Sequence, residues 1–414
     1  MEFAAYYSVP MLMLHRVRIG EFPGRDLPDH LVCEALELSL LAFGLICLGY
    51  FLIPENGSLI PRFRMVWSNP GVLRIAAAVM CAVGLFATYF MNQHRQISSP
   101  SQFVSFASDL VMYGIALLFT LQMSHKLNPL YLFALWGFFI PARLLVGVSS
   151  GAAAEVLDVG LVMLVLYSEL KGRLWWSAIL LGMVGVAVLR PLMTPFRDLT
   201  WIHGAQAGGS SVQKLKVFGN VVTGAAEGRF GNYDMLTQFA ATRLCVTCTF
   251  ADVLRQTPAI VPYWGGDTYT EILYKPIPRF LWPGKPRDET GQEFGHRYGY
   301  LAIGDYESTY NLPQTVELYA NFGFAGLIIG SLLFGIFYRT AELMFFHPHS
   351  GVGAVALGSV ILAQLLGIES GASLEIGGYL WGLVAVGLVN LVIYVAESLS
   401  DSAIATPAAA WPPR

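Results

Sequence analysis

The chain has 414 residues, a net charge of −3, only 13% charged residues and a mean hydropathy of +0.55. A soluble domain carries about 25% charged residues, and charges are costly in hydrocarbon, so the composition indicates an integral membrane protein. The small negative net charge supplies no basic field for nucleic acid, and five cysteines are too few for a disulfide scaffold.

Nine apolar stretches approach the length of about 20 residues that a helix needs to cross a bilayer. They are 36–53, 71–91, 106–123, 129–148, 152–169, 174–194, 316–338, 351–368 and 377–396. The segment before them is either an interfacial helix or part of a tenth span. Because lipid offers no partner to open backbone, we predict an all-α polytopic membrane protein with about nine to ten transmembrane helices.

Successive loops of a polytopic membrane protein lie on alternate sides of the membrane. The side whose loops are richer in Lys and Arg is predicted to be cytoplasmic. One side receives Arg62, Arg64, Arg74, Lys126, Lys171, Arg173 and Arg339, and we expect it to be cytoplasmic. The organisation is then an N-terminal bundle of about six spans (1–194), a large outward-facing loop (195–315), a C-terminal bundle of three spans (316–396) and a disordered cytoplasmic tail (397–414). Arg16, Arg18 and Arg25 oppose this orientation unless the N-terminus holds a further span.

The large loop is mixed in charge and holds nearly half of the cationic residues. Aromatic residues run through it, which argues against disorder. Residues 232–255 predict a helix that lies against the membrane or the bundle. Residues 275–291 read KPIPRFLWPGKPRDETG, and their prolines stiffen the backbone. Rigid cations there suit either a diphosphate group or anionic lipid head groups.

Residues 255–330 contain RQTPAIVPYWGGDTYTEILYKPIPRFLWPGKP followed by YLAIGDYESTYNLPQTVELYANFGFAGLIIG. This stretch resembles the oligosaccharide repeat-unit polymerases of the O-antigen polymerase (Wzy-like) family. The similar elements are Pro258, the Pro262-Tyr263 pair with its following glycines, IPRFLWPGKP and VELYANFGFAGLIIG. The chain departs from the family pattern at residues 308–311, where Ser-Thr-Tyr-Asn stands in place of Thr-Ser.

The resemblance implies a GT-C-like glycosyltransferase in the bacterial cytoplasmic membrane. Such an enzyme polymerises undecaprenyl-diphosphate-linked oligosaccharide units into O-antigen, capsule or exopolysaccharide on the outer face, without a cofactor. A flippase and a chain-length regulator are then implied partners. Three alternatives stay open: a ligase that moves finished glycan to another acceptor, a transporter of lipid-linked glycan, and a non-catalytic scaffold.

The transfer needs cations that stabilise the departing diphosphate and a group that orients or deprotonates the acceptor hydroxyl. The candidate diphosphate ligands are Arg279, Arg243, Arg229, Lys285 and Arg287, and the candidate bases are His296 and Glu317. Their structural alternatives are head-group contact or snorkelling for the cations, a surface position for His296, and a helix-dipole partner for Glu317.

Three further features have mainly structural interpretations. Arg143 is an intramembrane charge, and so either functional or snorkelling. Asn321 suits a helix–helix hydrogen bond. Cys245 and Cys248 lie one helical turn apart and are interpreted as small packing residues. The HPH run at 347–349 lacks a third ligand, so we expect no metal site.

Overall fold

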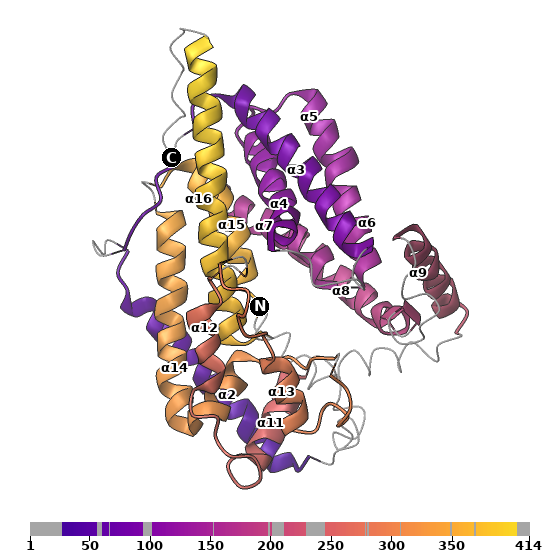
Figure 1. Ribbon diagram of the computed structural model, residues 1–414, viewed down its shortest axis with the longest axis vertical. Helices are drawn as coiled ribbons and strands as arrows, with labels where there is room; N and C mark the ends of the chain where they lie inside the picture. Colours follow the sequence, from indigo (N-terminus) through magenta and orange to yellow (C-terminus); the bar gives the residue numbers. More distant parts are fainter. Residues whose placement is uncertain are drawn as a thin grey trace. The chain divides into compact units, whose positions relative to one another are not determined.

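The computed structural model describes residues 27–55, 60–65, 67–93, 102–151, 153–197, 199–200, 211–228, 245–277, 279, 281–306, 308–347, 350–367 and 370–403. In these residues the chain forms helices and no strand, so the predicted all-α class is confirmed (Figure 1). The candidate N-terminal span lies outside them. The tail predicted to be disordered over 397–414 begins later than expected, because residues 397–403 are helical, and its part beyond residue 403 lies outside the described residues.

Each predicted span overlaps a helix. The helices are α2 (Asp29–Leu52), α3 (Pro70–Gln93), α4 (Gln102–Met123), the continuous α5–η2–α6 (Pro129–Ser150), α7 (Ala153–Lys171), α8 (Trp176–Arg197), α14 (Gln314–Phe346), α15 (Gly351–Gln364) and α16 (Ala372–Ala403). Within the described ranges, six are long and apolar enough to cross a membrane: α2, α3, α4, α5–α6, α14 and α16. The α7 helix carries Glu155, Asp158, Glu169 and Lys171, and α15 has only 14 residues. The six helices indicate a membrane protein.

The chain divides into two compact units that both draw on distant parts of the sequence. One unit consists of Met1–Ile60, Gln238–Leu343 and Gln364–Trp381, and the other of Pro61–Thr237, Met344–Ala363 and Gly382–Arg414. The first unit therefore combines α2, most of the predicted outer loop, nearly all of α14 and the beginning of α16.

Small residues let the helices within each unit approach closely, as they do in membrane bundles. In the first unit, a Cβ on Gly335 would lie 2.1 Å from the Ile46 carbonyl oxygen, so α14 and α2 touch backbone to backbone. In the second, a Cβ on Gly84 would lie 2.2 Å from the Val111 nitrogen, where α3 meets α4. A side chain at either glycine would force the paired helices apart.

The α14 helix is not one straight span. Gly323 has φ 63° and ψ −148°, a conformation essentially restricted to glycine, and it interrupts the helix. A Cβ on Gly330 would lie 2.1 Å from Leu318 Cδ2, although the two residues are 12 positions apart. Gln314 also hydrogen-bonds Tyr338. The first segment therefore folds back along the second, and the helix predicted over 316–338 is in fact a tight hairpin.

The predicted outer loop contains α9 (Ser211–Ala226), α11 (Val246–Gln256), α12 (Thr270–Tyr274) and α13 (Thr290–Arg297). Residues 229–244 lie outside the described part, so only the end of the helix predicted over 232–255 is seen. Phe250 and Val253 of α11 are fully buried in one core with Val32 and Ala35 of α2. The predicted packing of this segment against the bundle is confirmed for α11.

Candidate functional site

The Pro-rich strip, defined as residues 275–287, is braced by its own cations. The Lys285 ammonium donates to the carbonyl oxygens of Lys275 (2.8 Å) and Ile277 (2.9 Å) and is buried. The exposed Arg279 guanidinium donates to the carbonyls of Lys285 (2.7 Å) and Pro286 (2.9 Å). Two side chains thus tie the strip into a closed loop, which adds hydrogen bonds to the stiffness of its prolines.

These hydrogen bonds leave the positive charge of the strip in place, because Lys285 and Arg279 donate to uncharged backbone carbonyls and not to carboxylates. Burial, together with the nearby charges of Arg279 and Lys275, lowers the pKa of Lys285 from its ordinary value. Lys285 therefore serves to shape the strip. Arg279 and Arg287 carry its exposed charge.

The strip is anchored to α12 and α16 through Lys275. Its ammonium lies 2.5 Å from Asp288 and 3.6 Å from Glu271 of α12. Its carbonyl also accepts the Trp381 indole N–H at 3.2 Å. A Cβ on Gly377 would lie 2.6 Å from Lys275 Cδ, so glycine leaves room for the lysine stem against α16. The strip thus rests on rigid elements.

Glu271 is a buried carboxylate that sequence reasoning did not single out. It accepts hydrogen bonds from the hydroxyls of Thr290 (2.7 Å) and Ser373 (3.3 Å). Burial raises the pKa of Glu271, and the hydrogen bond from Thr290 opposes that rise. The available signal was its spacing of four residues from Lys275, which places an acid and a base on one face of a helix.

Glu317 lies in the first turn of α14 and is fully buried. Its Oε2 accepts the backbone N–H of Ala372, the first residue of α16, at 2.6 Å. A Cβ on Gly371 would lie 3.0 Å from the same oxygen. Glu317 therefore caps the helix next to its own, which differs from the predicted role as a dipole partner of α14. A catalytic role for Glu317 stays a prediction.

A loop covers the interruption in α14. The N–H groups of Trp264 and Gly265 donate to the carbonyls of Ala320 (3.1 Å) and Asn321 (3.2 Å). The break at Gly323 leaves these carbonyls without helical partners, and an irregular backbone in a membrane protein is tolerated where protein covers it. The PYWGG and VELYANFG elements, noted separately in the sequence, therefore form one structural unit.

The Asn321 side chain fastens this unit together. Its amide donates to the Thr268 hydroxyl and the Glu317 carbonyl, both at 2.9 Å, and its oxygen accepts the Gly266 N–H at 2.9 Å. The predicted helix–helix hydrogen bond is thus replaced by bonds between α14 and the covering loop. Asn321 is fully buried, and both ends of its side-chain amide are hydrogen-bonded, as buried polar groups require.

The remaining site candidates are scattered. Arg229 and Arg243 lie outside the described residues. Arg287 is the exposed last residue of the strip. His296 lies in the last turn of α13, where its ring is 5.3 Å from that of Tyr306. The structure thus brings Arg279, Lys285 and Arg287 together in one strip and places His296 on a separate helix.

Arg143 is paired within its own unit. It is buried, and its guanidinium lies 3.1 Å from the Glu155 carboxylate at the start of α7. A snorkelling side chain would keep its head group exposed, so that interpretation was wrong. The ion pair gives Arg143 a structural partner between α6 and α7.

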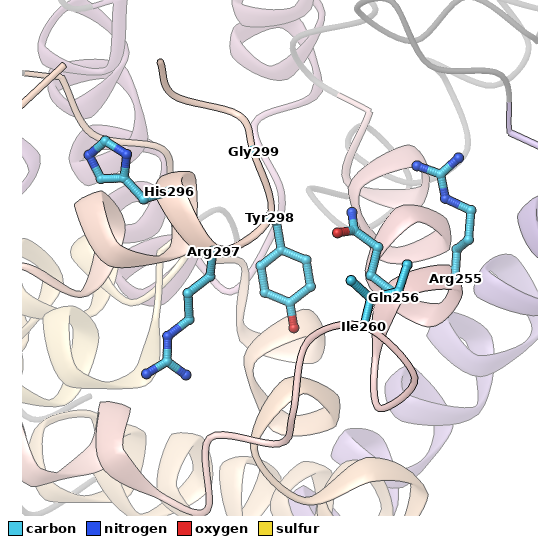
Figure 2. A pocket seen from close by; sticks show the side chains of 7 residues that line it. All are labelled: Arg255, Gln256, Ile260, His296, Arg297, Tyr298 and Gly299. Atoms are coloured by element: carbon cyan, nitrogen blue, oxygen red, sulfur yellow. The ribbon is translucent and has the colours of Figure 1, made fainter. Parts of the chain in front are cut away.

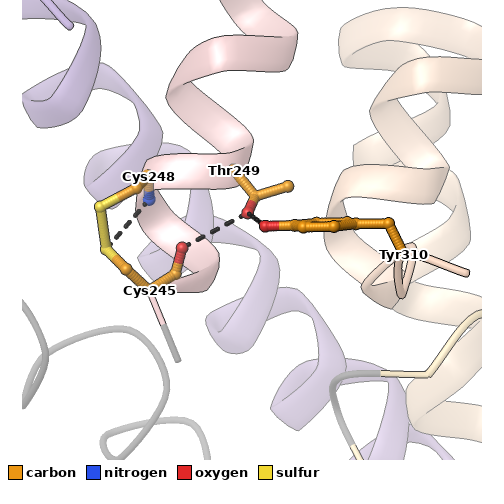
Figure 3. Close-up of a disulfide and its surroundings, with 4 residues drawn as sticks. All are labelled: Cys245, Cys248, Thr249 and Tyr310. Carbon is orange, nitrogen blue, oxygen red and sulfur yellow. Dashed lines mark hydrogen bonds between the residues drawn. A yellow bond between two sulfur atoms is a disulfide. The ribbon is translucent and has the colours of Figure 1, made fainter. Parts of the chain in front are cut away.

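Cys245 and Cys248 form a disulfide at the start of α11 (Figure 3). Cys245 is the N-cap residue, and its Sγ accepts the Cys248 N–H at 3.2 Å. Both cysteines are buried, but they are joined to each other, so their interpretation as small packing residues was wrong. Disulfides persist mainly in oxidising compartments, so the bond bears on the side of the membrane to which α11 belongs.

In the comparisons with known proteins, one family model matches, a domain of unknown function (DUF8712), and it covers residues 32–396. The chain belongs to this family. No curated protein and no solved structure matches the chain.

Proposed function

We propose that this DUF8712 protein is a metal-independent membrane glycosyltransferase. It polymerises oligosaccharide units carried on undecaprenyl diphosphate at the outer face of the bacterial cytoplasmic membrane. The observation that carries the proposal is the braced strip, in which Arg279 and Arg287 present charge from a backbone held rigid by Lys285. A preorganised cationic surface suits a departing diphosphate, because guanidinium groups match phosphate oxygens in geometry and charge.

The proposed topology has nine or ten spans in a GT-C-like arrangement with the strip outside. Hydrogen bonds between helix ends support this topology. If successive loops lie on alternate sides of the membrane, each of these bonds joins two helix ends that are predicted to lie on the same side. Arg197, the last residue of α8, donates to the Gly151 carbonyl before α7 at 2.8 Å, on the proposed outer side. Glu397 near the end of α16 accepts the N–H groups of Ser68 and Asn69, before α3, on the proposed inner side. The disulfide at α11 also favours an oxidising outer compartment.

A second candidate function, transport of lipid-linked glycan, is favoured by the interrupted α14. Transporters bind substrate at discontinuous helices near the bilayer midplane. Here the break lies nine residues after the start of α14, close to one end, and a loop fills it. That placement fits a rigid platform beneath the strip better than a midplane substrate site.

A gel of surface polysaccharide tests the proposal. A deletion strain would be complemented with wild type, Arg279→Ala, Arg287→Ala or the control Arg173→Ala, whose arginine is exposed between α7 and α8. We expect the deletion to lose the long-chain ladder and still display single repeat units. Wild type and the control should restore the ladder, and the two strip variants should not.

Other gel patterns point elsewhere. An unchanged ladder in the deletion strain contradicts the polymerase. Full-length polymer retained on its lipid carrier indicates a ligase, and loss of single units together with the ladder indicates a transporter.

A further inference from the structure

A pocket separate from the strip opens between the end of α11 and the end of α13. It has a volume of about 500 Å³ and is lined by Arg255, Gln256, Ile260, His296, Arg297, Tyr298 and Gly299 (Figure 2). The size is that of a pocket for a small molecule or for part of a larger one. Among the residues that the structure describes, its lining includes two arginines and a histidine and no carboxylate. The composition of the walls therefore favours an anionic group.

One wall is preset by a buried carboxylate behind it. Asp252 is fully buried and accepts from Arg255 (2.5 Å), Gln256 (3.0 Å) and the Tyr300 hydroxyl (2.9 Å). These bonds fix Arg255 and Gln256 before any ligand arrives. Both side chains come from the last turn of α11 and stand on one side of the pocket in Figure 2.

The opposite wall holds its arginine by different means. The Arg297 guanidinium lies 4.0 Å from the ring centroid of the buried Trp264 and 2.5 Å from the Glu293 carboxylate. Stacking on an indole leaves the edge of the guanidinium fork available to further acceptors. About a third of each arginine side chain is exposed, 35% for Arg255 and 33% for Arg297. Two preorganised guanidinium groups therefore face solvent from opposite walls.

We propose that this pocket binds a carboxylate or phosphate group carried by a saccharide. The anion preference follows from the two arginines, which offer planar forks of donors to such groups. That a saccharide carries the anion rests on the proposed function, which brings glycan chains to this unit. The pocket then selects acidic repeat units, and the strip holds the diphosphate.

Ligand-observed NMR titration of the full chain in zwitterionic nanodiscs tests the pocket. The probes are glucuronate, glucose 6-phosphate and neutral glucose. We expect both anions to bind at least about tenfold more tightly than glucose, on the scale of one charge-assisted hydrogen bond. Added salt should weaken anion binding. Equal binding of all three probes, or no binding, would overturn the proposal.

Variants assign the binding to this pocket. Arg255→Gln and Arg297→Gln should each weaken glucuronate binding about tenfold, and Arg173→Gln should leave it unchanged. Arg297→Lys keeps the charge without the fork; it should bind with intermediate strength, and it replaces Arg297→Gln if that variant misfolds. Loss of glucuronate binding in nanodiscs that contain anionic lipid would assign the site to lipid head groups and overturn the saccharide source.

The two proposals fail separately. A deletion strain that loses its ladder, together with a purified protein that does not prefer anions, leaves the polymerase and removes the pocket. An unchanged ladder together with binding lost in the arginine variants removes the polymerase and leaves an anion pocket.

Discussion

The Glu317 carboxylate of α14 accepts the N–H of Ala372 at 2.6 Å and so connects the starts of two helices that are far apart in sequence. The Asn321 amide donates to the Thr268 hydroxyl of the covering loop and to the Glu317 carbonyl oxygen, both at 2.9 Å. Glu317 and Asn321 together therefore join α14, α16 and the loop that closes the break in α14. This contact gives Glu317 a structural task that is independent of any proton transfer.

Substitutions at Glu317 separate the two roles. Glu317→Ala removes the acceptor of a buried N–H and should lower the free energy of unfolding by about 2 kcal/mol. Glu317→Gln keeps an acceptor oxygen, so the loss should be at most about 1 kcal/mol. We expect Glu317→Gln to retain polymer formation. A folded Glu317→Gln protein without polymer would instead identify Glu317 as the base.

Gly323 should resist replacement because of its backbone conformation. Its φ of 63° and ψ of −148° disfavour every other residue, and an added Cβ would lie 2.8 Å from the Tyr263 hydroxyl. We expect Gly323→Ala to destabilise the protein by about 2 to 4 kcal/mol, measured by chemical unfolding in detergent. Gly378→Ala is the control, because a Cβ on that α16 glycine meets no atom within 4 Å. Equal stability of the two variants would contradict the hairpin.

The raised pKa of Glu271 predicts a pH dependence of stability. A carboxyl that is more basic in the folded than in the unfolded state stabilises the fold fully below its unfolded pKa, near 4.5, and this contribution is lost as pH rises through the folded pKa. Glu271→Gln should therefore lose less unfolding free energy than wild type as pH rises from about 4.5. Glu289→Gln, at an exposed glutamate, should follow wild type. Parallel wild-type and Glu271→Gln curves would refute the prediction.

The disulfide should be detected by alkylation and mass spectrometry. Denatured protein from intact cells should take up label at Cys33, Cys47 and Cys81, the three free cysteines. Reduction should expose Cys245 and Cys248 as two further sites. Replacing both by Ser should cost about 2 kcal/mol by the chain-entropy estimate for so short a loop. Labelling of all five cysteines without reductant would place α11 in a reducing compartment.

The brace predicts local rather than global loosening. Lys285→Met keeps the buried stem and removes the donors to the Lys275 and Ile277 carbonyls. Hydrogen exchange should therefore speed up over residues 275–288 and change little in α2 or α14. Lys216→Met, at an exposed lysine of α9, should leave the exchange of the strip at the wild-type rate. An unchanged rate in Lys285→Met would mean that the prolines alone hold the strip.

The sequence by itself determined the class of protein and the approximate positions of most of its long helices. Long apolar runs such as 71–91 and 377–396 are typical of membrane proteins and not of soluble ones. In lipid a backbone is stable only when its own hydrogen bonds are satisfied internally, so such runs are predicted to be helices. The stiffness of the strip was also predicted, because proline fixes its own φ wherever it stands.

Only the tertiary structure decided where polar groups meet. The break at Gly323, the cap from Glu317 to Ala372 and the inward turn of Lys285 depend on partners up to 55 residues away, which no local pattern specifies. Hydrophobic burial follows composition and period, whereas a buried carboxylate or carbonyl is stable only beside a particular donor. That donor is supplied by the fold.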